Sequence, residues 1–405
     1  MAEAKRILII VENLPVPFDR RVWLESRTLR NAGYDISVIC PQGMGYMEPY
    51  EVIDGIHIYR YPAPPPTTTR LSYAWEFPYC WFKSLALARK ISRERGLDAI
   101  HACNPPDTFF LIGLLFKLFG KTRFVYDQHD LCPELYLSRF GGRKAVYYVL
   151  LRALEWATYR SADMVLSTNC SYKQHAVDVG GFPADDIFVV RSGPEIDHFA
   201  PVPPDAALRK GKKHLVCYLG VMGPQDGLDY LLRAIRHVVD VVKRRDVHFA
   251  LIGSGDSFPA IKELREDLGL TDCVDMTGRI PDDDVRRYLS TADVCVCPDP
   301  RNPLNDVSTM NKVLEYMIFG KPMVSFELLE SRYSAQDGAL YASPNDEIEF
   351  GDRIIQLLDD PDLRAEMGRR NRARIERELS WDHTSKELLS AYAHLFGRDV
   401  GGEVD

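Results

Sequence analysis

The segment STMNKVLEYMIFGKPMV (308–324) carries the residues whose types and spacing are best suited to bind a phosphorylated ligand. Ser308 is a good N-cap and the apolar residues after it fit one helix face, so the segment predicts a helix that begins just past a strand. The free N–H groups and positive dipole end of such a helix attract phosphate. Lys312 then lies beside the anion, and Glu315 lies one turn further on, where a carboxylate can bind two ribose hydroxyls. The alternative is a capped surface helix with an unrelated Lys and Glu.

Four further polar residues lie near a predicted strand end or helix start in the first half of the chain. His101 and Asp107 flank a predicted strand end, so they either line a ligand cleft or have a structural role. Arg20 and Arg21 stand at a predicted helix start, where their charge opposes the helix dipole. They form either a solvated surface pair or, as we prefer, a site for a phosphate group of a substrate.

Three patterns that look like metal or cofactor motifs are better explained by local structure. Asp282, Asp283 and Asp284 contain the DxD spacing of a Mg²⁺ site, but they stand at the start of an amphipathic helix, where acidic residues complement the dipole. GSGD (253–256) lacks the third glycine of a dinucleotide fingerprint, because Phe258 stands in its place. The nine cysteines show no CxxC pair and no zinc spacing, so we interpret them as reduced core thiols. The sequence predicts no metal and no resident cofactor.

Short β-branched runs alternate with longer helical patterns along the whole chain, which is typical of βαβ units with parallel sheets. In the first half the predicted strands are RILIIV (6–11), DISVIC (35–40), IHIYRY (56–61), DAIHA (98–102), RFVYD (123–127), DMVLS (163–167) and IFVV (187–190). In the second half they are HLVCYLG (214–220), VHFALIG (247–253), CVDMTG (273–278), DVCVC (293–297) and KPMVSF (321–326). PAPPPTTTR (62–70) fits neither element and predicts an exposed loop.

The chain of 405 residues is too long for one ordinary core, and a stretch rich in Pro, Gly and charge (191–213) has the composition of a domain linker. We predict two α/β domains of Rossmann-like, doubly wound parallel sheets, over residues 1–200 and 201–380. A helix within 381–405 is expected to pack back toward the N-terminal domain. Ligands are then expected in a cleft at the carboxyl ends of both sheets.

The charge distribution argues against nucleic acid as a partner, because the net charge is −8. Residues 1–200 hold 23 Lys and Arg against 22 Asp and Glu, which is +1 and leaves −9 for the rest. The N-terminal half is thus the one that can approach an anionic surface. The longest apolar stretch (109–116) is about half a membrane span and predicts a buried helix. No export signal is visible, so we expect a cytoplasmic protein, at the inner face of the membrane.

The chain as a whole resembles the family-4 retaining glycosyltransferases of GT-B fold. In the second half the resemblance is carried by 308–324 and by RSGPEIDHF (191–199), YLGVMGPQDGLDYLLRAI (218–235), LIGSGD (251–256) and TGRIPDDDVRRYLSTADVCVCP (277–298). In the first half it is carried by FDRRVWLESRTLRNAGYDISVICP (18–41), DAIHACNPPDTFFL (98–111) and FVYDQHDLCPELY (124–136). The resemblance implies a nucleotide-sugar donor as substrate and no dependence on a metal ion.

The resemblance also assigns roles to single positions. Glu315 matches the second Glu of a paired-glutamate motif that holds the ribose, and His129 matches a histidine that faces the reacting sugar. The catalytic candidates are His129, Lys312 and Glu315. The other donor-binding candidates are Arg191, Gly220, Gly223, Gly253, Gly255, Arg279, Ile280, Asp306, Ser308, Thr309, Met310 and Asn311. The turn of residues 278–280 is expected to contact the nucleotide base. The acceptor-binding candidates are Arg20, Arg21, His101, Asp130 and Glu134.

This sequence departs from the family pattern at three places. Val307, with Asp306 beside it, stands where the first Glu of the paired motif is usual. Val221 and Asp226 replace the usual Arg and Lys that clamp the diphosphate. The usual glycine-rich turn after the first strand is replaced by residues 17–21. The clamp must then be rebuilt, and the candidates are Lys312 and Arg191.

We therefore predict a retaining glycosyltransferase that moves a sugar from a nucleoside-diphosphate donor to a glycan or lipid-linked acceptor. Membrane contact is expected through residues 141–160, whose apolar and aromatic positions exceed one buried stripe and whose cations suit an anionic interface. Two alternatives remain open, because the fold does not fix the reaction. One is a GT-B scaffold that binds a nucleotide without catalysis, and the other is a sugar-nucleotide epimerase or hydrolase.

Overall fold

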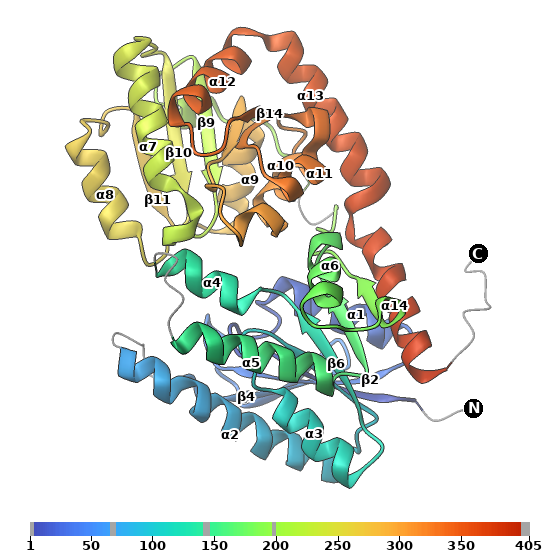
Figure 1. The fold of residues 1–405 in the computed structure, drawn as a ribbon. Helices are drawn as coiled ribbons and strands as arrows, with labels where there is room; N and C mark the ends of the chain where they lie inside the picture. Colours follow the sequence, from blue (N-terminus) through green and yellow to red (C-terminus); the bar gives the residue numbers. More distant parts are fainter. Residues whose placement is uncertain (1–3, 65–69, 141–145, 197–199, 398–405) are drawn as a thin grey trace. The chain divides into compact units, whose positions relative to one another are not determined.

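The computed structural model describes residues 4–64, 70–140, 146–196 and 200–397, which divide into two compact units (Figure 1). Unit 1 comprises Met1–Leu137, Arg143–Ser192 and Thr384–Asp405, and unit 2 comprises Ser138–Gly142 and Gly193–His383. The main passage from unit 1 to unit 2 therefore falls inside the predicted linker. The predicted loop 62–70 lies mostly outside the described residues.

Unit 1 is built on an eight-stranded sheet in the order β3-β4-β2-β1-β5-β6-β7-β8. The strands are β1 (Arg6–Ile10), β2 (Asp35–Pro41), β3 (Tyr50–Ile53), β4 (Ile56–Tyr61), β5 (Ala99–Cys103), β6 (Arg123–Gln128), β7 (Met164–Ser167) and β8 (Ile187–Val189). All neighbours pair in parallel except β3 and β4. The seven strands predicted for the first half are confirmed. The strand order reverses between β1 and β5, which marks the carboxyl ends of these strands as the place for a ligand.

Strand β3 was not predicted, although its turn carries a recognisable signal. Asp54 and Gly55 connect β3 to β4 with φ values of 49° and 75°, the left-handed conformation of a two-residue hairpin turn. The strand itself is only four residues long and lies at the sheet edge, half exposed. A run this short gives too little alternation to identify a strand.

The helices of unit 1 are α1 (Arg20–Asn31), α2 (Arg70–Glu94), α3 (Phe110–Phe119), α5 (Val146–Ser161) and α6 (Cys170–Asp178), with α4 (Cys132–Arg139) through Leu137 and α14 (Trp381–Phe396) from Thr384. Helix α3 packs closely on β6. The Phe124 ring lies so near Gly113 that a Cβ at this position would be 2.5 Å from the ring. Within the predicted stretch 109–116, Leu111 is 44% exposed and Leu114, Leu115 and Phe116 are half-buried, so the predicted buried helix is buried only in part. No helix in the described residues is long and apolar enough to cross a membrane.

Unit 2 is built on six parallel strands in the order β11-β10-β9-β12-β13-β14, reversing between β9 and β12. The strands are β9 (His214–Leu219), β10 (Val247–Ile252), β11 (Val274–Gly278), β12 (Val294–Cys297), β13 (Met323–Phe326) and β14 (Ala339–Ala342). The helices are α7 (Leu228–Arg236), α8 (Phe258–Asp267), α9 (Asp282–Thr291), α10 (Asn311–Ile318), α11 (Leu329–Ala335), α12 (Glu347–Asp359) and α13 (Pro361–Arg374). The two Rossmann-like units confirm the predicted fold class. The short β14 was not predicted.

Two local predictions need correction. Helix α10 begins at Asn311 with Met310 as its N-cap, whereas Ser308 had been predicted as the cap. Ser308 lies two residues before this cap, at the end of a 3₁₀ turn, and its hydroxyl donates to the carbonyl of Leu304. All nine cysteines are free thiols, and eight are buried. Cys170 is exposed because it is the first residue of α6.

Candidate active site

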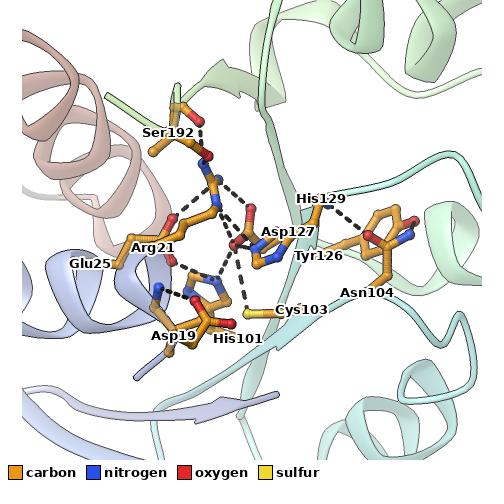
Figure 2. Close-up of polar contacts among 12 residues, drawn as sticks. Asp19, Arg21, Glu25, His101, Cys103, Asn104, Tyr126, Asp127, His129 and Ser192 are labelled. Carbon is orange, nitrogen blue, oxygen red and sulfur yellow. Dashed lines mark hydrogen bonds and ion pairs between the residues drawn. The ribbon is translucent and has the colours of Figure 1, made fainter. Parts of the chain in front are cut away.

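The carboxylate of Asp127 is the centre of a buried polar cluster in unit 1 (Figure 2). Asp127 lies near the end of β6, and its Oδ1 accepts a hydrogen bond of 2.7 Å from Nη2 of Arg21 on α1. Its Oδ2 lies 2.5 Å from Nε2 of His129 and 3.2 Å from Nε2 of His101. Three cationic or polar groups from three elements therefore converge on one carboxylate. Asp127 was not predicted as a site residue.

Arg21 holds this cluster together. Its Nη2 also lies 3.1 Å from Oε1 of Glu25, and its Nη1 donates to the carbonyl of Val190 at 2.7 Å. Burial alone would raise the pKa of Asp127, but Arg21 and His129 lower it well below its usual value, so Asp127 is ionised. Burial raises the pKa of Glu25 well above its usual value, against the effect of Arg21. One full negative charge thus faces the guanidinium.

His101 and Arg21 were predicted to contact the acceptor, and their burial gives them another role. His101 is fully buried and its Nδ1 lies 2.8 Å from the hydroxyl of Tyr392 on α14. Burial lowers its pKa, so the ring is neutral. We therefore reassign both side chains from acceptor contact to the positioning of Asp127. Arg20 is exposed and keeps its predicted place at the surface of α1.

Asn104 fixes the turn that carries His129 and Asp130 after β6. Its Oδ1 accepts from the backbone N–H groups of His129 at 2.7 Å and Asp130 at 3.1 Å, and its Nδ2 donates to the Asp130 carbonyl at 2.7 Å. Asn104 in turn donates to Asp107, whose pKa is raised by burial to about 6. Both His129 and Asp130 stay partly exposed, as a contact to substrate requires.

Glu134, another predicted acceptor residue, is engaged in a second ionic cluster. It accepts from Arg152 on α5, which also donates to Glu155 at 2.6 Å. Burial raises the pKa of Glu134, and Arg152 and His175 oppose the rise. Because the side chain is buried against α5, its role is to hold that helix, and we reassign it accordingly.

In unit 2, four of the five predicted glycines form a close-packed set of turns at the carboxyl ends of β9 and β10. A Cβ on Gly253 would lie 1.8 Å from the carbonyl oxygen of Gly220, and one on Gly255 would lie 2.7 Å from that of Met222. Gly223 donates its N–H to Asp226 at 2.8 Å. Gly253 also pairs with Gly278, at the end of β11. The turns can approach one another and a ligand this closely only without side chains.

Lys312 lies beneath this glycine turn with a buried ammonium group. Its Nζ lies 2.7 and 3.0 Å from the two carboxylate oxygens of Asp299, 3.4 Å from the Tyr218 hydroxyl and 3.7 Å from Asp226. Although burial opposes the charged form, Asp299 and the other neighbours raise the pKa of Lys312 well above its usual value. A Cβ on Gly220 would lie 3.2 Å from Cε of Lys312, so the Lys312 stem packs against the turn. Burial raises the pKa of Asp226 to about 6, although the nearby Lys312 ammonium acts to lower it.

The remaining predicted donor residues occupy varied positions. Glu315 is half-buried on α10, Arg279 is exposed after β11, Ile280 is half-buried, and Arg191 is buried after β8 in unit 1. Asp306 accepts from the N–H of Leu329 at 3.0 Å and from Arg301 at 3.2 Å, so it caps α11. Ser308, Thr309 and Met310 are half-buried and Asn311 is exposed at the start of α10. The pairing of Arg191 with Lys312 stays a prediction.

The acidic groups that resemble metal ligands are engaged with arginines in the described residues. His101, Cys103 and Asp127 form one group of suitable spacing, and Arg21 is bound to its carboxylate. Glu134, Glu155 and His175 form another, and Arg152 lies among them. The triplet 282–284 is in the first turn of α9, where acidic residues complement the helix dipole as predicted, and Asp283 and Asp284 pair with arginines one turn on. None of the three is the cap, because Pro281 is the N-cap and no side chain caps the helix.

The site residues missed by sequence reasoning are Asp127, Glu25, Asn104, Tyr218 and Asp299. Each is a partner of a predicted residue, brought to it from another element. The sequence offers one weak signal, which is that Asp127 lies near the end of the buried strand β6 and Asn104 directly follows β5, both at the carboxyl end of the sheet.

Solved structures share this arrangement of two Rossmann-like units. The chain is similar to a sucrose-phosphate synthase of Thermosynechococcus elongatus, with a TM-score of 0.80 and 18% identity over 97% of this chain and 99% of the other. It is also similar to the Anabaena protein HepE in complex with UDP-glucose, with a TM-score of 0.72 and 15% identity over 96% and 99%. The fold is therefore GT-B.

Sequence comparisons assign the family. A model described as "Glycosyl transferase 4-like domain" matches residues 19–193, and one described as "Glycosyl transferases group 1" matches residues 213–360. An uncharacterised glycosyltransferase of Methanocaldococcus jannaschii is 23% identical over 379 residues, which is 89% of this chain and 90% of the other. The chain belongs to the family-4 glycosyltransferases and is an enzyme of that class.

The glycine turns give a testable consequence for stability. Gly253→Ala should lower the free energy of unfolding by more than about 3 kcal/mol, because the new Cβ meets a backbone oxygen at 1.8 Å and the φ of +133° is strained for Ala. Gly269→Ala is the matched control, since φ is also positive but nothing lies within 4 Å, and it should cost about 1 kcal/mol. Urea unfolding measures both. Equal losses would contradict the packing of these turns.

Proposed function

We propose that this glycosyltransferase moves a sugar from a nucleoside-diphosphate donor to a glycan or lipid-linked acceptor, with retention at the anomeric carbon and without a metal ion. The observation that carries the proposal is the buried Lys312, whose side-chain stem packs against the glycine turn after β9. This turn lies beside the point where the strand order of unit 2 reverses, between β9 and β12. Such points are where nucleotides bind in open α/β sheets.

The donor diphosphate is proposed to bind where the β9 turn and the start of α10 meet. Backbone N–H groups of a glycine turn and of a helix N-terminus attract phosphate. The adjacent Lys312 ammonium adds positive charge, which its ion pair with Asp299 offsets in part. These groups stabilise the charge that develops on the leaving diphosphate, the role that Mg²⁺ has in other enzymes. HepE, solved with UDP-glucose, is a relative in fold that binds a donor of this class.

His129 is proposed to face the reacting sugar, and Asp130 the acceptor. Both are partly exposed on a turn that Asn104 fixes through three hydrogen bonds. In a retaining front-face reaction the leaving diphosphate itself helps to remove the proton of the acceptor hydroxyl, so no protein nucleophile is needed. The buried Asp127 then serves to hold His129.

A lipid-linked acceptor is proposed because the outer face of α5 is apolar. Val146, Val149, Leu150 and Trp156 are 88%, 65%, 49% and 54% exposed, and with Ala153 they follow the i, i+3, i+4, i+7 spacing of one helix face. The stripe ends at Arg160, which lies over the Trp156 ring. The predicted excess of apolar positions over one buried stripe is thus confirmed for the described part of 141–160. Residues 141–145 lie outside the described residues.

The inner face of α5 explains why the apolar stripe faces outward. Arg152 and Glu155 bind Glu134 of α4 and His175 of α6, and His175 Nε2 lies 2.9 Å from Glu155. This ionic cluster fixes the rotation of the helix about its axis. The only acidic residue of α5 is therefore buried, while Arg160 is exposed. A face of this composition suits the interface of an anionic membrane, and we propose that the enzyme works at the cytoplasmic face.

We expect Glu315→Ala to weaken donor binding, because the carboxylate is proposed to bind the ribose hydroxyls. Loss of a charged hydrogen bond costs about 1.5–3 kcal/mol, or roughly 10- to 150-fold in the dissociation constant. A thermal-shift screen of UDP, GDP, ADP and CMP sugars first selects the nucleotide, and calorimetry then measures the affinity. Glu263→Ala, an exposed change on α8, is the control. An affinity unchanged by Glu315→Ala would contradict the assignment.

Transfer should proceed in EDTA at the rate seen without it, and the product should keep the donor's anomeric configuration. The reason is that Lys312 and the helix N-terminus stabilise the leaving group in place of a metal. Release of nucleoside diphosphate measures the rate, and NMR of the product measures the anomeric configuration. Loss of activity that Mg²⁺ restores would instead favour the triplet 282–284 as a metal site. Free sugar as the only product would indicate a hydrolase.

The α5 face predicts binding to anionic vesicles. Changing Val149, Leu150 and Trp156 together to Ser should reduce co-sedimentation at least about tenfold, because each large apolar side chain contributes roughly 1.5–3 kcal/mol when buried. Val241→Ser, also exposed and apolar but in unit 2, is the control. Neutral vesicles should bind the wild-type protein less well. Absence of the wild type from both vesicle types, with good transfer to a water-soluble acceptor, would contradict the proposal.

A further inference from the structure

A continuous chain of polar contacts runs through unit 1 from the C-terminal helix to His129. The Tyr392 hydroxyl on α14 lies 2.8 Å from Nδ1 of His101 on β5, whose Nε2 lies 3.2 Å from Oδ2 of Asp127. The same Oδ2 lies 2.5 Å from Nε2 of His129. Tyr392, His101 and Asp127 are fully buried, while the His129 side chain is 17% exposed. This series of polar contacts therefore begins in the core of unit 1 and ends at the surface.

The proton positions along this chain follow from the groups that meet. Nε2 of His101 lies 3.2 Å from Oδ2 of the ionised Asp127, and Glu25 is further away at 3.6 Å, so its nearest neighbour is a carboxylate oxygen. An ionised carboxylate only accepts, which requires Nε2 of the neutral His101 ring to carry the proton. Nδ1 is then the lone-pair nitrogen, and the Tyr392 hydroxyl donates to it. No other donor is needed to satisfy His101.

The same reasoning sets the tautomer of His129. Arg21 lowers the pKa of Asp127 and keeps it ionised, so Asp127 accepts from Nε2 of His129. Nε–H of Arg21 is shared between that nitrogen, at 3.0 Å, and Oδ2 of Asp127, at 3.4 Å. A lone pair on Nε2 would face the ionised Oδ2 at 2.5 Å, so the nitrogen bears hydrogen. Nδ1 of His129 is then the acceptor. It makes no hydrogen bond to the residues that the structure describes.

We propose that Asp127 and Tyr392 are positioning residues that hold His129 as the Nε2–H tautomer, so that its Nδ1 accepts a hydrogen bond from a hydroxyl group of the reacting sugar. The sugar as partner rests on the proposed function, whereas the tautomer does not. The C-terminal helix is accordingly part of the active-site framework of unit 1, although no residue of α14 touches substrate. Its contribution is one hydroxyl that fixes the His101 ring.

The first test is the tautomer of His129 in the enzyme without substrate. Long-range ¹H–¹⁵N spectra of histidine-labelled protein distinguish Nε2–H from Nδ1–H rings, and we expect His129 and His101 both to be Nε2–H. A His129 ring found as Nδ1–H, or doubly protonated at pH 7.5, would overturn the proposal. This measurement needs no activity, so it stands apart from the proposed function.

Asp127→Asn supplies the decisive change, since an amide NH₂ can donate to Nε2 of His129 and force the proton to Nδ1. We expect that tautomer switch together with a fall in kcat on the order of 10³-fold, while KM changes less than about threefold, as when a wrong tautomer impairs a histidine. An unchanged tautomer with a lost kcat would mean that Asp127 is merely structural, against the proposal. A switched tautomer with unchanged kcat would also contradict it.

Tyr392→Phe keeps the proposal testable where Asp127→Asn fails to fold. The variant keeps the ring contacts of Tyr392 with Tyr34 and Phe396, at 5.7 and 6.3 Å between centroids, and removes only the donor to His101. We expect the ¹⁵N shift of His101 Nδ1 to move and kcat to fall about fivefold. Phe396→Leu alters the same packing and leaves the hydroxyl, so it should change neither quantity. Equal effects of the two variants would overturn the role of the hydroxyl.

Discussion

The buried ion pair between Arg21 and Asp127 is the interaction on which the unit 1 site depends. It joins α1 to the end of β6, and the same guanidinium binds the carbonyl of Val190 after β8, so three elements distant in sequence are fixed by one side chain. Removing one partner of a buried pair leaves an uncompensated charge, at a cost of about 3–5 kcal/mol, whereas the intact pair adds little net stability. The ion pair therefore serves mainly to fix the positions of these elements. It keeps Asp127 ionised, and an ionised Asp127 orients two histidines.

Unit 2 follows the same principle with the charges exchanged. A buried ammonium, Lys312, is held by the carboxylate of Asp299, and Asp226 stands 3.7 Å away. The family pattern places a cation at position 226, where this chain has Asp. In the proposed donor site the cation is supplied from α10 rather than from the β9 turn, and Asp226 is one of its neighbours. The glycines matter because Gly220 leaves room for the Lys312 stem directly below the turn.

Helix α5 shows how an ionic cluster can decide the exposure of apolar residues. The hydrophobic effect alone would turn the Val146, Val149, Leu150 and Trp156 stripe inward. The contacts of Arg152 and Glu155 with Glu134 and His175 oppose that rotation, since turning the helix would separate charges from their partners. Exposed apolar area of this kind marks an interaction site in a folded protein. The apolar face and the buried charges are therefore one arrangement.

The sequence by itself determined the alternation of strands and helices, the two Rossmann-like units and the places of Lys312 and His129, because these depend on local periodicity and on motifs within one stretch of chain. It missed β3 and β14, which lie at the edges of their sheets and are only partly buried, whereas the equally short β7, β12 and β13 are fully buried apolar runs. It also gave Arg21, His101 and Glu134 the wrong surroundings, predicting substrate contacts for side chains that the fold buries. Only the tertiary structure decided their partners, since Asp127 reaches Arg21 across 106 positions and Tyr392 reaches His101 across 291. Pairing at such separations is set by which strands become neighbours, and no local pattern encodes it.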